Sequence, residues 1–334
     1  MTRPLSTILT AAAATIGLAA MPPTAAAQDA NSEAAALIQN DGQTSLSDQV
    51  FADGRTRRGL AVQIMLDRAG FSPGVIDGRG GGNTEAAIRA FQRANGMTVD
   101  GKAGSAVVKA LRDAHGGRYI RAVQIKERDR SKSFQPVPSG MAEQAEADHL
   151  GYEGLDELLA ERYHMDIDLL RAMNPDVDWE SVNAGDPVLV VRAGPAKLDR
   201  TVDRIVISKS ENALRAYSGD TLVARYPATV GSSEMPSPSG EMTVRAVAPE
   251  ATYTFNPDTN DWGGDEALQI AAGPNNPVGG VWIDLSKDTY GIHGTPDPAL
   301  IGKTASHGCV RLTNWDAREL ADAVETGAAV EFVG

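Results

Sequence analysis

Ser306-His307-Gly308-Cys309-Val310-Arg311-Leu312, at residues 306–312, is the stretch that decides how this 334-residue chain folds. Cys309 is the only cysteine of the chain, so it has no partner for an internal disulfide. A thiol attacks only as the thiolate, and its ordinary pKa of about 8.5 leaves a small ionised fraction at neutral pH. A nearby imidazole that takes the proton is the usual activator. The stretch therefore predicts a reactive cysteine with a histidine base.

Two histidines are candidates for that base. His307 stands two residues before Cys309, where an extended backbone would put both side chains on one face, but Gly308 implies a tight turn. His293 lies in a second Gly-flanked cluster, residues 291–295, and arrives from a separate strand. The residues alone leave both imidazoles open. Gly308 also removes bulk beside the thiol, which suits backbone N–H groups aimed at a developing oxyanion.

The residues around these clusters predict a β-rich domain. Short β-branched and aromatic runs separated by turn residues precede them: DRIVISKS (203–210), ALRAYSG (213–219) and TLVARYPATVG (221–231). We expect these runs to form an antiparallel sheet. Thr313, with Asp316 three residues later, predicts the start of a helix that leads to a closing strand, AAVEFV (328–333).

The two clusters carry a family resemblance. IHG (292–294) followed by SHGCVRL resembles the L,D-transpeptidase catalytic domain, also called the YkuD domain, from about Val202 to Gly334. VGSSEMPSPSGEMTV (230–244) resembles the turn that follows an early strand in this family, with Pro238 and Gly240 in the expected places. The resemblance implies a mainly-β catalytic domain of antiparallel sheets with a C-terminal helix over residues 200–334.

The resemblance also implies roles for individual residues. Cys309 would be the acyl-accepting nucleophile and His293 the general base, with the carbonyl of Gly294 orienting its imidazole. Backbone amides around Gly308 and Cys309 would form the oxyanion hole. The guanidinium of Arg311 is suited to a carboxylate of the stem peptide or to holding the active-site loop. The substrate pocket would be shaped by Ser306, His307 and Arg311.

The N-terminus predicts export. An apolar stretch from Ile8 to Ala20 and the run Ala25-Ala26-Ala27 read as a secretory signal peptide, residues 1–27. Residues 28–55 lack periodicity and are expected to be a flexible leader. No later apolar run is long enough to span a membrane, so we expect a mature chain without a transmembrane segment, in the periplasm or cell wall space.

Three segments separate the leader from the catalytic domain. Residues 56–113 show three helical patterns and two Asp-Gly turns, at Asp77 and Asp100, and resemble the small all-α peptidoglycan-binding domain. Residues 114–143 are charge-dense and predict a linker. Residues 144–193 look like a small α+β LysM-type module whose opening strand is not recognisable. His164, in this module, has no metal-type neighbour and receives no role.

Composition excludes several other classes of function. The net charge of −13 and the pI near 4.9 oppose binding to nucleic acid. The chain has no Gly-rich phosphate loop with Lys, no Cys-x-x-Cys pair and no His-Glu-x-x-His sequence. We therefore expect neither a metal nor an organic cofactor.

The expected reaction is acyl transfer in peptidoglycan. Cys309 would attack an L,D-peptide bond of a stem tetrapeptide, expel D-Ala and form a thioester, which an amine would resolve into a 3–3 cross-link. Expected partners are stem peptides and glycan strands. The same thioester could pass to water, as in an L,D-carboxypeptidase or amidase, or to the lysine of a wall-anchored lipoprotein. A wall-binding protein without activity is the alternative of a different class.

Overall fold

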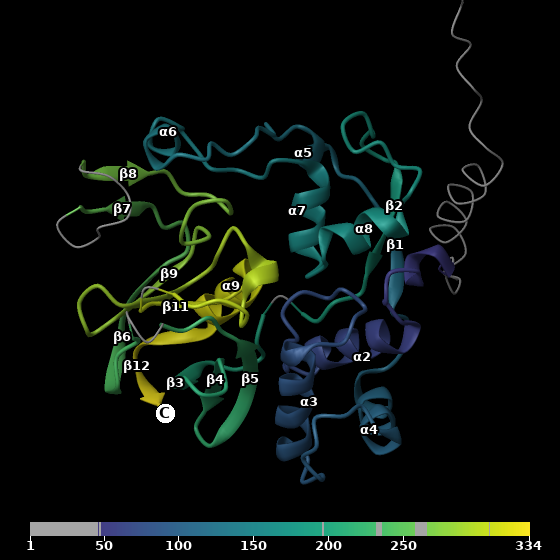
Figure 1. Cartoon of the computed structure of the whole chain (residues 1–334), viewed down its shortest axis with the longest axis horizontal. Coiled ribbons are helices and arrows are strands. Elements are labelled where there is room, and N and C mark those ends of the chain that lie inside the picture. The colour runs from purple at the N-terminus through teal and green to yellow at the C-terminus, as the bar shows by residue number, and fades with distance from the viewer. Residues whose placement is uncertain (1–45, 47, 196, 232–235, 258–265, 307) are drawn as a thin grey trace, which may run out of the picture.

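The structure is a computed structural model, and it describes residues 46, 48–195, 197–231, 236–257, 266–306 and 308–334. These residues form a helical unit (48–115), a middle unit (120–191) and a β unit (202–333), which Figure 1 shows in purple-blue, teal and green-yellow. The predicted signal peptide and most of the predicted leader lie outside the described residues. Within the described part of the chain, no helix has the length and apolarity needed to cross a bilayer.

The helical unit repeats one packing arrangement. Its elements are η1 (Asp48–Phe51), α2 (Arg57–Arg68), α3 (Gly82–Ala94) and α4 (Ser105–His115). The side-chain oxygen of Gln63 on α2 accepts the N–H groups of the Asp77-Gly78 turn at 3.2 and 2.7 Å. Gln92 on α3 does the same for Asp100-Gly101, at 3.0 and 2.9 Å. The two predicted Asp-Gly turns are therefore held in the same way, each by a glutamine of the preceding helix.

The middle unit has a strand that the sequence analysis missed. Its elements are β1 (Ile120–Gln124), α5 (Glu127–Arg130), α6 (Met141–Ala145), α7 (Leu155–Arg162), α8 (Ile167–Met173) and β2 (Pro187–Val191). β1 pairs antiparallel with β2, and Ile120 lies opposite Val191. The linker prediction is wrong for residues 120–124, since they supply the opening strand of this unit. The charged residues that follow β1 concealed it.

The end of the predicted leader is also ordered. Leu46 and Val50 are 6% and 2% exposed, and both belong to the apolar core of the middle unit. Leu60 and Ile64, on one side of α2, reach the same core, whereas Val62 and Leu66 on its other side pack inside the helical unit. The flexible-leader prediction is therefore wrong for these last residues, because their apolar side chains are buried between two units.

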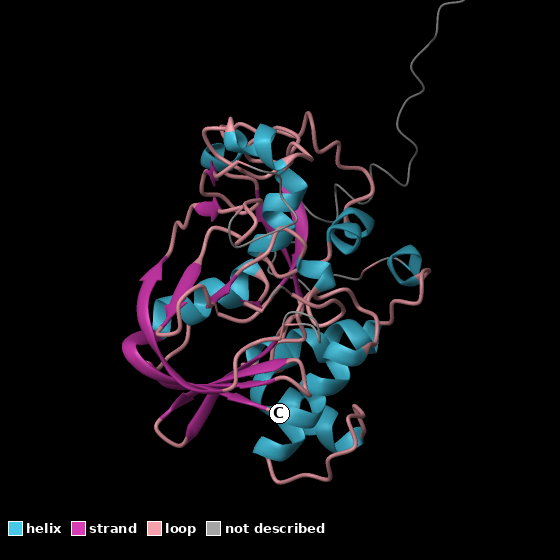
Figure 2. Cartoon of the chain, turned by 60° about the vertical axis from the view of Figure 1, so that its left-hand side comes forward, coloured by secondary structure: helices cyan, strands magenta, loops and turns pink. Residues whose placement is uncertain are grey.

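The β unit is one strongly curved sheet with helix α9 packed against it (Figure 2). Its strands run in the order β11-β10-β9-β6-β12-β3-β4-β5. Ala317 and Leu320 of α9 are fully buried in the core of this sheet. The bounds are β3 Val202–Ser208, β4 Ala213–Ser218, β5 Thr221–Pro227, β6 Gly240–Ala248, β7 Tyr253–Phe255, β8 Leu268–Ile270, β9 Trp282–Leu285, β10 Gly291–His293, η2 Pro298–Leu300, β11 Val310–Arg311, α9 Asn314–Ala323 and β12 Val324–Val333.

The sheet is mixed, which corrects the expectation of an antiparallel one. β12 pairs with β3 in parallel, and β10 pairs with β11 in parallel, while the other neighbours are antiparallel. Strands β7 and β8 form a separate hairpin. Helix α9 begins as predicted, because the Thr313 hydroxyl accepts the Asp316 N–H at 3.2 Å. The parallel β10–β11 pair brings the two motif clusters together.

Candidate active site

The register of β10 and β11 places His293 beside Arg311, two residues after Cys309. Ile292 lies opposite Val310, and both are fully buried in the core. Because side chains alternate along a strand, the residues on either side of this pair point to the opposite face. That face therefore carries His293 and Arg311 on neighbouring strands, and Cys309 directly precedes β11. The pairing thus brings the strand of the predicted base beside the segment that carries the predicted nucleophile.

His293 is a neutral imidazole with a defined tautomer. Its Nδ1 lies 2.7 Å from the carbonyl oxygen of Gly294, and since a carbonyl only accepts, Nδ1 carries the proton and Nε2 keeps its lone pair. Burial, and then the positive charge of Arg311, lower the pKa of His293 to about 4, against the opposing effect of the Gly294 carbonyl. The ring is thus uncharged at neutral pH and able to accept a proton.

Trp282 fixes the plane of this ring, and the sequence analysis did not single it out. It lies opposite His293 in the β9–β10 pairing, and the two rings stack with centroids 5.5 Å apart and an interplanar angle of 20°. A Cβ on Gly291 would come within 2.3 Å of the indole. Gly291 is therefore needed for the indole to lie across β10. The only sequence signal for this stacking was Gly291, the first glycine of residues 291–294, Gly-Ile-His-Gly.

Cys309 is a partly buried, protonated thiol. Its sulfur lies 3.5 Å from the carbonyl oxygen of Thr289, so the S–H donates to that carbonyl. Burial raises the pKa of Cys309, with the Gly291 backbone and the positive charge of Arg311 opposing the rise. Thr289 has a φ of 71°, which a β-branched residue rarely adopts. A strained backbone therefore presents the carbonyl that holds the thiol.

Ser306 and Ser237 hold the turn that carries Cys309. The Ser306 hydroxyl donates to the carbonyl of Cys309 at 2.5 Å and accepts the N–H of Gly308 at 3.1 Å. The hydroxyl of Ser237, from the turn before β6, donates to the Gly308 carbonyl at 2.7 Å. The Gly308 amide is thus already engaged, which leaves the Cys309 N–H as the candidate oxyanion donor. Ser237 was not among the predicted site residues.

Two further groups border the thiol. Arg311 lies opposite His293, and its backbone N–H donates to the carbonyl of Thr229 at 2.9 Å. Tyr253, on the β7–β8 hairpin, is close enough to Cys309 that a charge on the thiol raises the pKa of Tyr253, although burial of Tyr253 has the larger effect.

The other two residues of the predicted pocket turn are Gly308 and His307. Gly308 has a φ of 115°, and a Cβ there would approach the Tyr290 ring to 2.9 Å. His307 lies outside the described residues.

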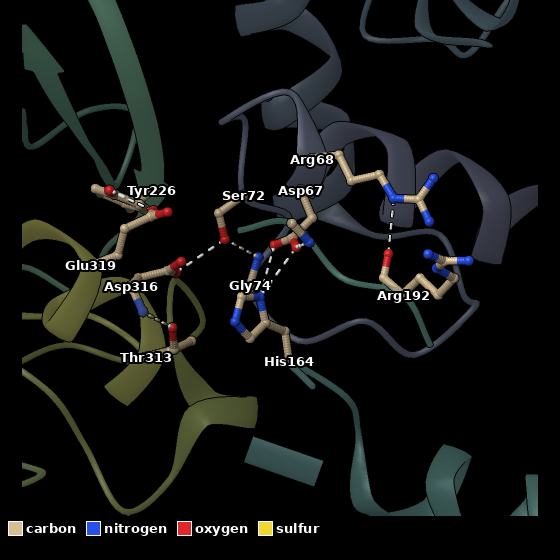
Figure 3. Close-up of polar contacts among 11 residues, drawn as sticks. Asp67, Arg68, Ser72, Gly74, His164, Arg192, Tyr226, Thr313, Asp316 and Glu319 are labelled. Carbon is tan, nitrogen blue, oxygen red and sulfur yellow. Dashed lines mark hydrogen bonds and ion pairs between the residues drawn. The ribbon is translucent and has the colours of Figure 1, made fainter. Parts of the chain in front are cut away.

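A second cluster of titratable groups lies away from the thiol, where the three units meet. It lines a cavity of about 650 Å³ with residues of all three units, among them Asp67, His164 and Asp316. Figure 3 shows the polar contacts of this cluster. Among the described residues, no group of three or more His, Cys, Asp or Glu side chains has the arrangement to hold a metal ion.

Comparison with known proteins identifies the families of two of the three units. The family of L,D-transpeptidase catalytic domains, YkuD, matches residues 202–332, and a family of peptidoglycan binding domains matches residues 60–111. The Bacillus licheniformis protein named "Putative L,D-transpeptidase YkuD" is 34% identical over 164 residues, which are 49% of this chain and 84% of that protein. The chain belongs to the YkuD family of L,D-transpeptidases, and it is an enzyme.

Other matches cover less of the related chains. The Escherichia coli K12 protein named "Probable L,D-transpeptidase YbiS" is 31% identical over 183 residues, 53% of this chain and 59% of that protein. Among solved structures, an L,D-transpeptidase from Mycobacterium smegmatis is 18% identical, with a TM-score of 0.33 over 46% of this chain and 65% of that chain. The resemblance of the helical unit to a peptidoglycan-binding domain is confirmed by the family match.

Proposed function

We propose that this protein is an exported L,D-transpeptidase that joins peptidoglycan stem peptides through a thioester on Cys309. The observation that supports this most is the parallel pairing of β10 with β11, because it brings the strand of a neutral imidazole beside the segment that carries the thiol of Cys309. Peptidoglycan is the substrate that both matched domains imply. The predicted signal peptide, residues 1–27, is the basis for export.

Acylation begins with two neutral groups. Nε2 of His293 takes the thiol proton as the sulfur of Cys309 attacks the carbonyl carbon of the L,D-bond in a stem tetrapeptide. The oxyanion that forms accepts a hydrogen bond from the Cys309 N–H. The imidazolium then gives its proton to the departing nitrogen, the C–N bond breaks and D-Ala leaves. The product is a thioester between Cys309 and the stem tripeptide.

Deacylation reverses the proton transfers. An acceptor amine attacks the thioester carbonyl and loses a proton to His293, the C–S bond breaks, and the imidazolium returns its proton to the sulfur of Cys309. Arg311 lies opposite His293, and its positive charge opposes protonation of His293 and favours the thiolate of Cys309. The guanidinium also suits a carboxylate of the stem peptide. An amine on a neighbouring stem gives the 3–3 cross-link.

The other two units supply the wall-binding part of the proposal. The helical unit would bind peptidoglycan, in line with its family match. The middle unit has two antiparallel strands flanking helices α7 and α8, so the proposal of a LysM-like glycan-binding module gains the opening strand it lacked.

The test is incubation of the protein with a disaccharide-tetrapeptide. We expect release of D-Ala and a mass increase on Cys309 that matches the disaccharide-tripeptide acyl group, with carbapenems acylating the same thiol. A Cys309→Ala protein serves as the blank. Equal activity in that variant would contradict the proposal, and sacculus binding without any thiol acylation would favour the wall-binding protein without activity.

The products identify the acceptor. Dimeric muropeptides indicate transpeptidation, whereas tripeptide monomers indicate an L,D-carboxypeptidase or amidase. A muropeptide linked to a lysine of a lipoprotein would indicate anchoring of that partner to the wall. Stem peptides that differ at the third residue, offered in the same assay, determine which of them the pocket accepts.

A further inference from the structure

We infer that Glu161, on helix α7 of the middle unit, is a positioning residue for the catalytic imidazole of the β unit, and that it acts through Asn314. The inference rests on the proposed function, since it assigns His293 as the base. It gives the middle unit a part in catalysis besides any role in wall binding. The contact runs from α7 to the first residue of α9 and from there to the backbone beside His293.

The first step is the position of Asn314. Its side chain is buried, with the residue 1% exposed. Its Oδ1 accepts the N–H of Thr295 at 2.8 Å, and its Nδ2 donates to the carbonyl of Pro274 at 3.0 Å and to Oε2 of Glu161 at 2.8 Å. A backbone N–H only donates and a carbonyl only accepts, so these two partners fix which end of the amide is oxygen.

The second step is a single peptide group. The N–H that Asn314 holds and the carbonyl that accepts from His293 both belong to the peptide between Gly294 and Thr295. A peptide group is planar, so fixing the direction of its N–H also fixes the direction of its C=O. Rotation of this group would break both hydrogen bonds and release the Nδ1 of His293. Asn314 therefore determines how the imidazole is held.

Two glycines make room for this arrangement. A Cβ on Gly294 would lie 2.2 Å from Oδ1 of Asn314, and a Cβ on Gly279 would lie 1.9 Å from the same atom. The amide can approach the peptide after His293 only because both positions lack a side chain. Gly294, the glycine after His293, thus leaves the space that the Asn314 side chain occupies.

The third step is the contact with Glu161. Its Oε2 accepts from Asn314 and its Oε1 accepts from the hydroxyl of Tyr152 at 2.8 Å, so each carboxylate oxygen has a donor. Burial raises the pKa of Glu161, and its hydrogen bonds to Asn314 and Tyr152 oppose the rise. Without this acceptor, one N–H of the buried Asn314 amide would lose its partner, which would allow the amide to turn.

A neighbouring contact offers a matched control. Glu157 lies one helical turn before Glu161 and accepts from the side chain of Asn275 at 2.9 Å. Asn275 also donates to the carbonyl of Gly151 at 2.9 Å. This second contact also joins helix α7 to the β unit, but it reaches the loop between β8 and β9 and does not touch the peptide between Gly294 and Thr295. A loosened interface by itself would affect both contacts alike.

The experiment compares Glu161→Ala, Glu161→Gln and Glu157→Ala in the full chain. We expect Glu161→Ala to lower kcat for D-Ala release by about 10-fold with little change in KM, because a small misplacement of a catalytic group has an effect of this size or larger. Glu161→Gln keeps an acceptor for Asn314 and should retain most of the rate. Glu157→Ala should retain the wild-type kcat.

A double-mutant cycle and the reactivity of the thiol complete the test. Asn314→Ala should lower kcat like Glu161→Ala, and the double variant should be no slower than Asn314→Ala, because both residues act on one peptide group. The carbapenem acylation rate of Cys309 should fall in parallel. If Glu161→Ala does not fold, Glu161→Asp, which is too short to reach Asn314, takes its place with the same expected loss.

The outcomes separate the two proposals. A folded Glu161→Ala or Glu161→Asp protein with wild-type kcat overturns the inference, as does an equal loss in Glu157→Ala. If the wild-type protein itself neither releases D-Ala nor acylates Cys309, the proposed function fails instead.

Discussion

The candidate base and nucleophile are both uncharged at rest, and this is a property of individual residues. Burial disfavours charge on each of them, so the pKa of His293 falls to about 4 while the pKa of Cys309 rises. A preformed thiolate–imidazolium pair needs the reverse order of the two pKa values. Proton transfer therefore accompanies attack on the substrate. This arrangement also limits oxidation of the thiol, because thiolates oxidise faster than thiols.

The first prediction concerns the pH dependence of thiol reactivity. The thiolate fraction grows with pH, and the raised pKa moves its midpoint above about 8.5. The rate of alkylation of Cys309 by iodoacetamide should therefore keep rising through neutral pH and beyond that value. The measurement is the alkylation rate from pH 5 to 10, with Cys309→Ala as the blank. A plateau of fast alkylation between pH 5 and 7 would show a preformed ion pair instead.

The second prediction concerns the Ser306 hydroxyl, which closes the turn around the nucleophile. Ser306→Ala removes its hydrogen bonds to the Cys309 carbonyl and the Gly308 N–H. We expect a loss of about 1–3 kcal/mol in the free energy of unfolding and a fall in the acylation rate of about 10-fold. Chemical denaturation and carbapenem acylation measure the two effects. Ser306→Thr keeps the hydroxyl and is the control; equal losses in both variants would contradict the role of the hydroxyl.

The short strand β10 is the element on which the site depends. It is only three residues long, Gly291–His293, yet β9 flanks it on one side and β11 on the other. Its middle residue, Ile292, is fully buried and ties the strand to the core. On its other face, the absence of a side chain at Gly291 lets Trp282 lie across the strand and stack on His293. Gly291 therefore determines the orientation of the His293 ring, because it makes room for Trp282 to stack on that ring.

The third prediction tests this element. Gly291→Ala adds a methyl group where the Trp282 indole lies, so the indole must move away from His293. We expect an overpacking cost of about 1–3 kcal/mol in the free energy of unfolding and a lower kcat for D-Ala release. The control is Gly80→Ala, since a Cβ at Gly80 would meet no atom within 4 Å. Wild-type kcat in Gly291→Ala would mean that the stacking is not needed.

On the scale of the whole molecule, buried polar groups join the three units (Figure 3). Nδ1 of His164 lies 3.1 Å from Oδ2 of Asp67, and the His164 ring stacks on Trp315 at 5.3 Å. The Ser72 hydroxyl donates to Asp316 at 3.0 Å, and the hydroxyl of Tyr226 donates to Glu319 at 2.8 Å. Because these residues come from all three units, the state of this cluster affects how the units are held together.

Several groups of the cluster keep protons that they would lose in the unfolded chain. Burial raises the pKa of Asp316 to about 8 and that of Glu319 to about 7. Burial opposes charge on His164, but Asp67 and the other nearby acids outweigh it and raise its pKa. In each case the folded state binds protons more tightly than the unfolded state. The contribution of Asp316 to stability is therefore fully present below about pH 4 and is lost as the pH rises through about 8.

The fourth prediction follows from these raised pKa values, which make the folded state less stable as the pH rises. The melting temperature should fall as the pH rises from 5 to 8, with Asp316 contributing on the order of 1 kcal/mol per pH unit to the free energy of unfolding. Asp316→Asn cannot ionise and should flatten this dependence. Asp322→Asn, on the same helix but 41% exposed at its side chain, should leave it unchanged. Identical pH profiles for Asp316→Asn and the wild-type protein would contradict the prediction.

The sequence predicted local features well where the residues that form a feature lie close together in one short segment. Thr313 caps α9 through its own hydroxyl, and the two predicted Asp-Gly turns of the helical unit are present, although the glutamines that hold them were not predicted. The family of the catalytic domain followed from two short motifs, IHG (292–294) and SHGCVRL (306–312), and the family match confirms it. The strand β1 was missed because it stands beside a charge-dense segment, and only its pairing with β2, more than 60 residues away, makes it a strand.

The sequence by itself determined that the chain is an L,D-transpeptidase of the YkuD family and that Cys309 and His293 are the residues to examine. Only the tertiary structure decided how these residues are held. The parallel pairing of β10 with β11, the stacking of Trp282 on His293 and the contact from Glu161 to Asn314 join residues far apart in the chain. Such contacts depend on the register of strands and on the packing of separate units, and no local pattern of residues encodes either.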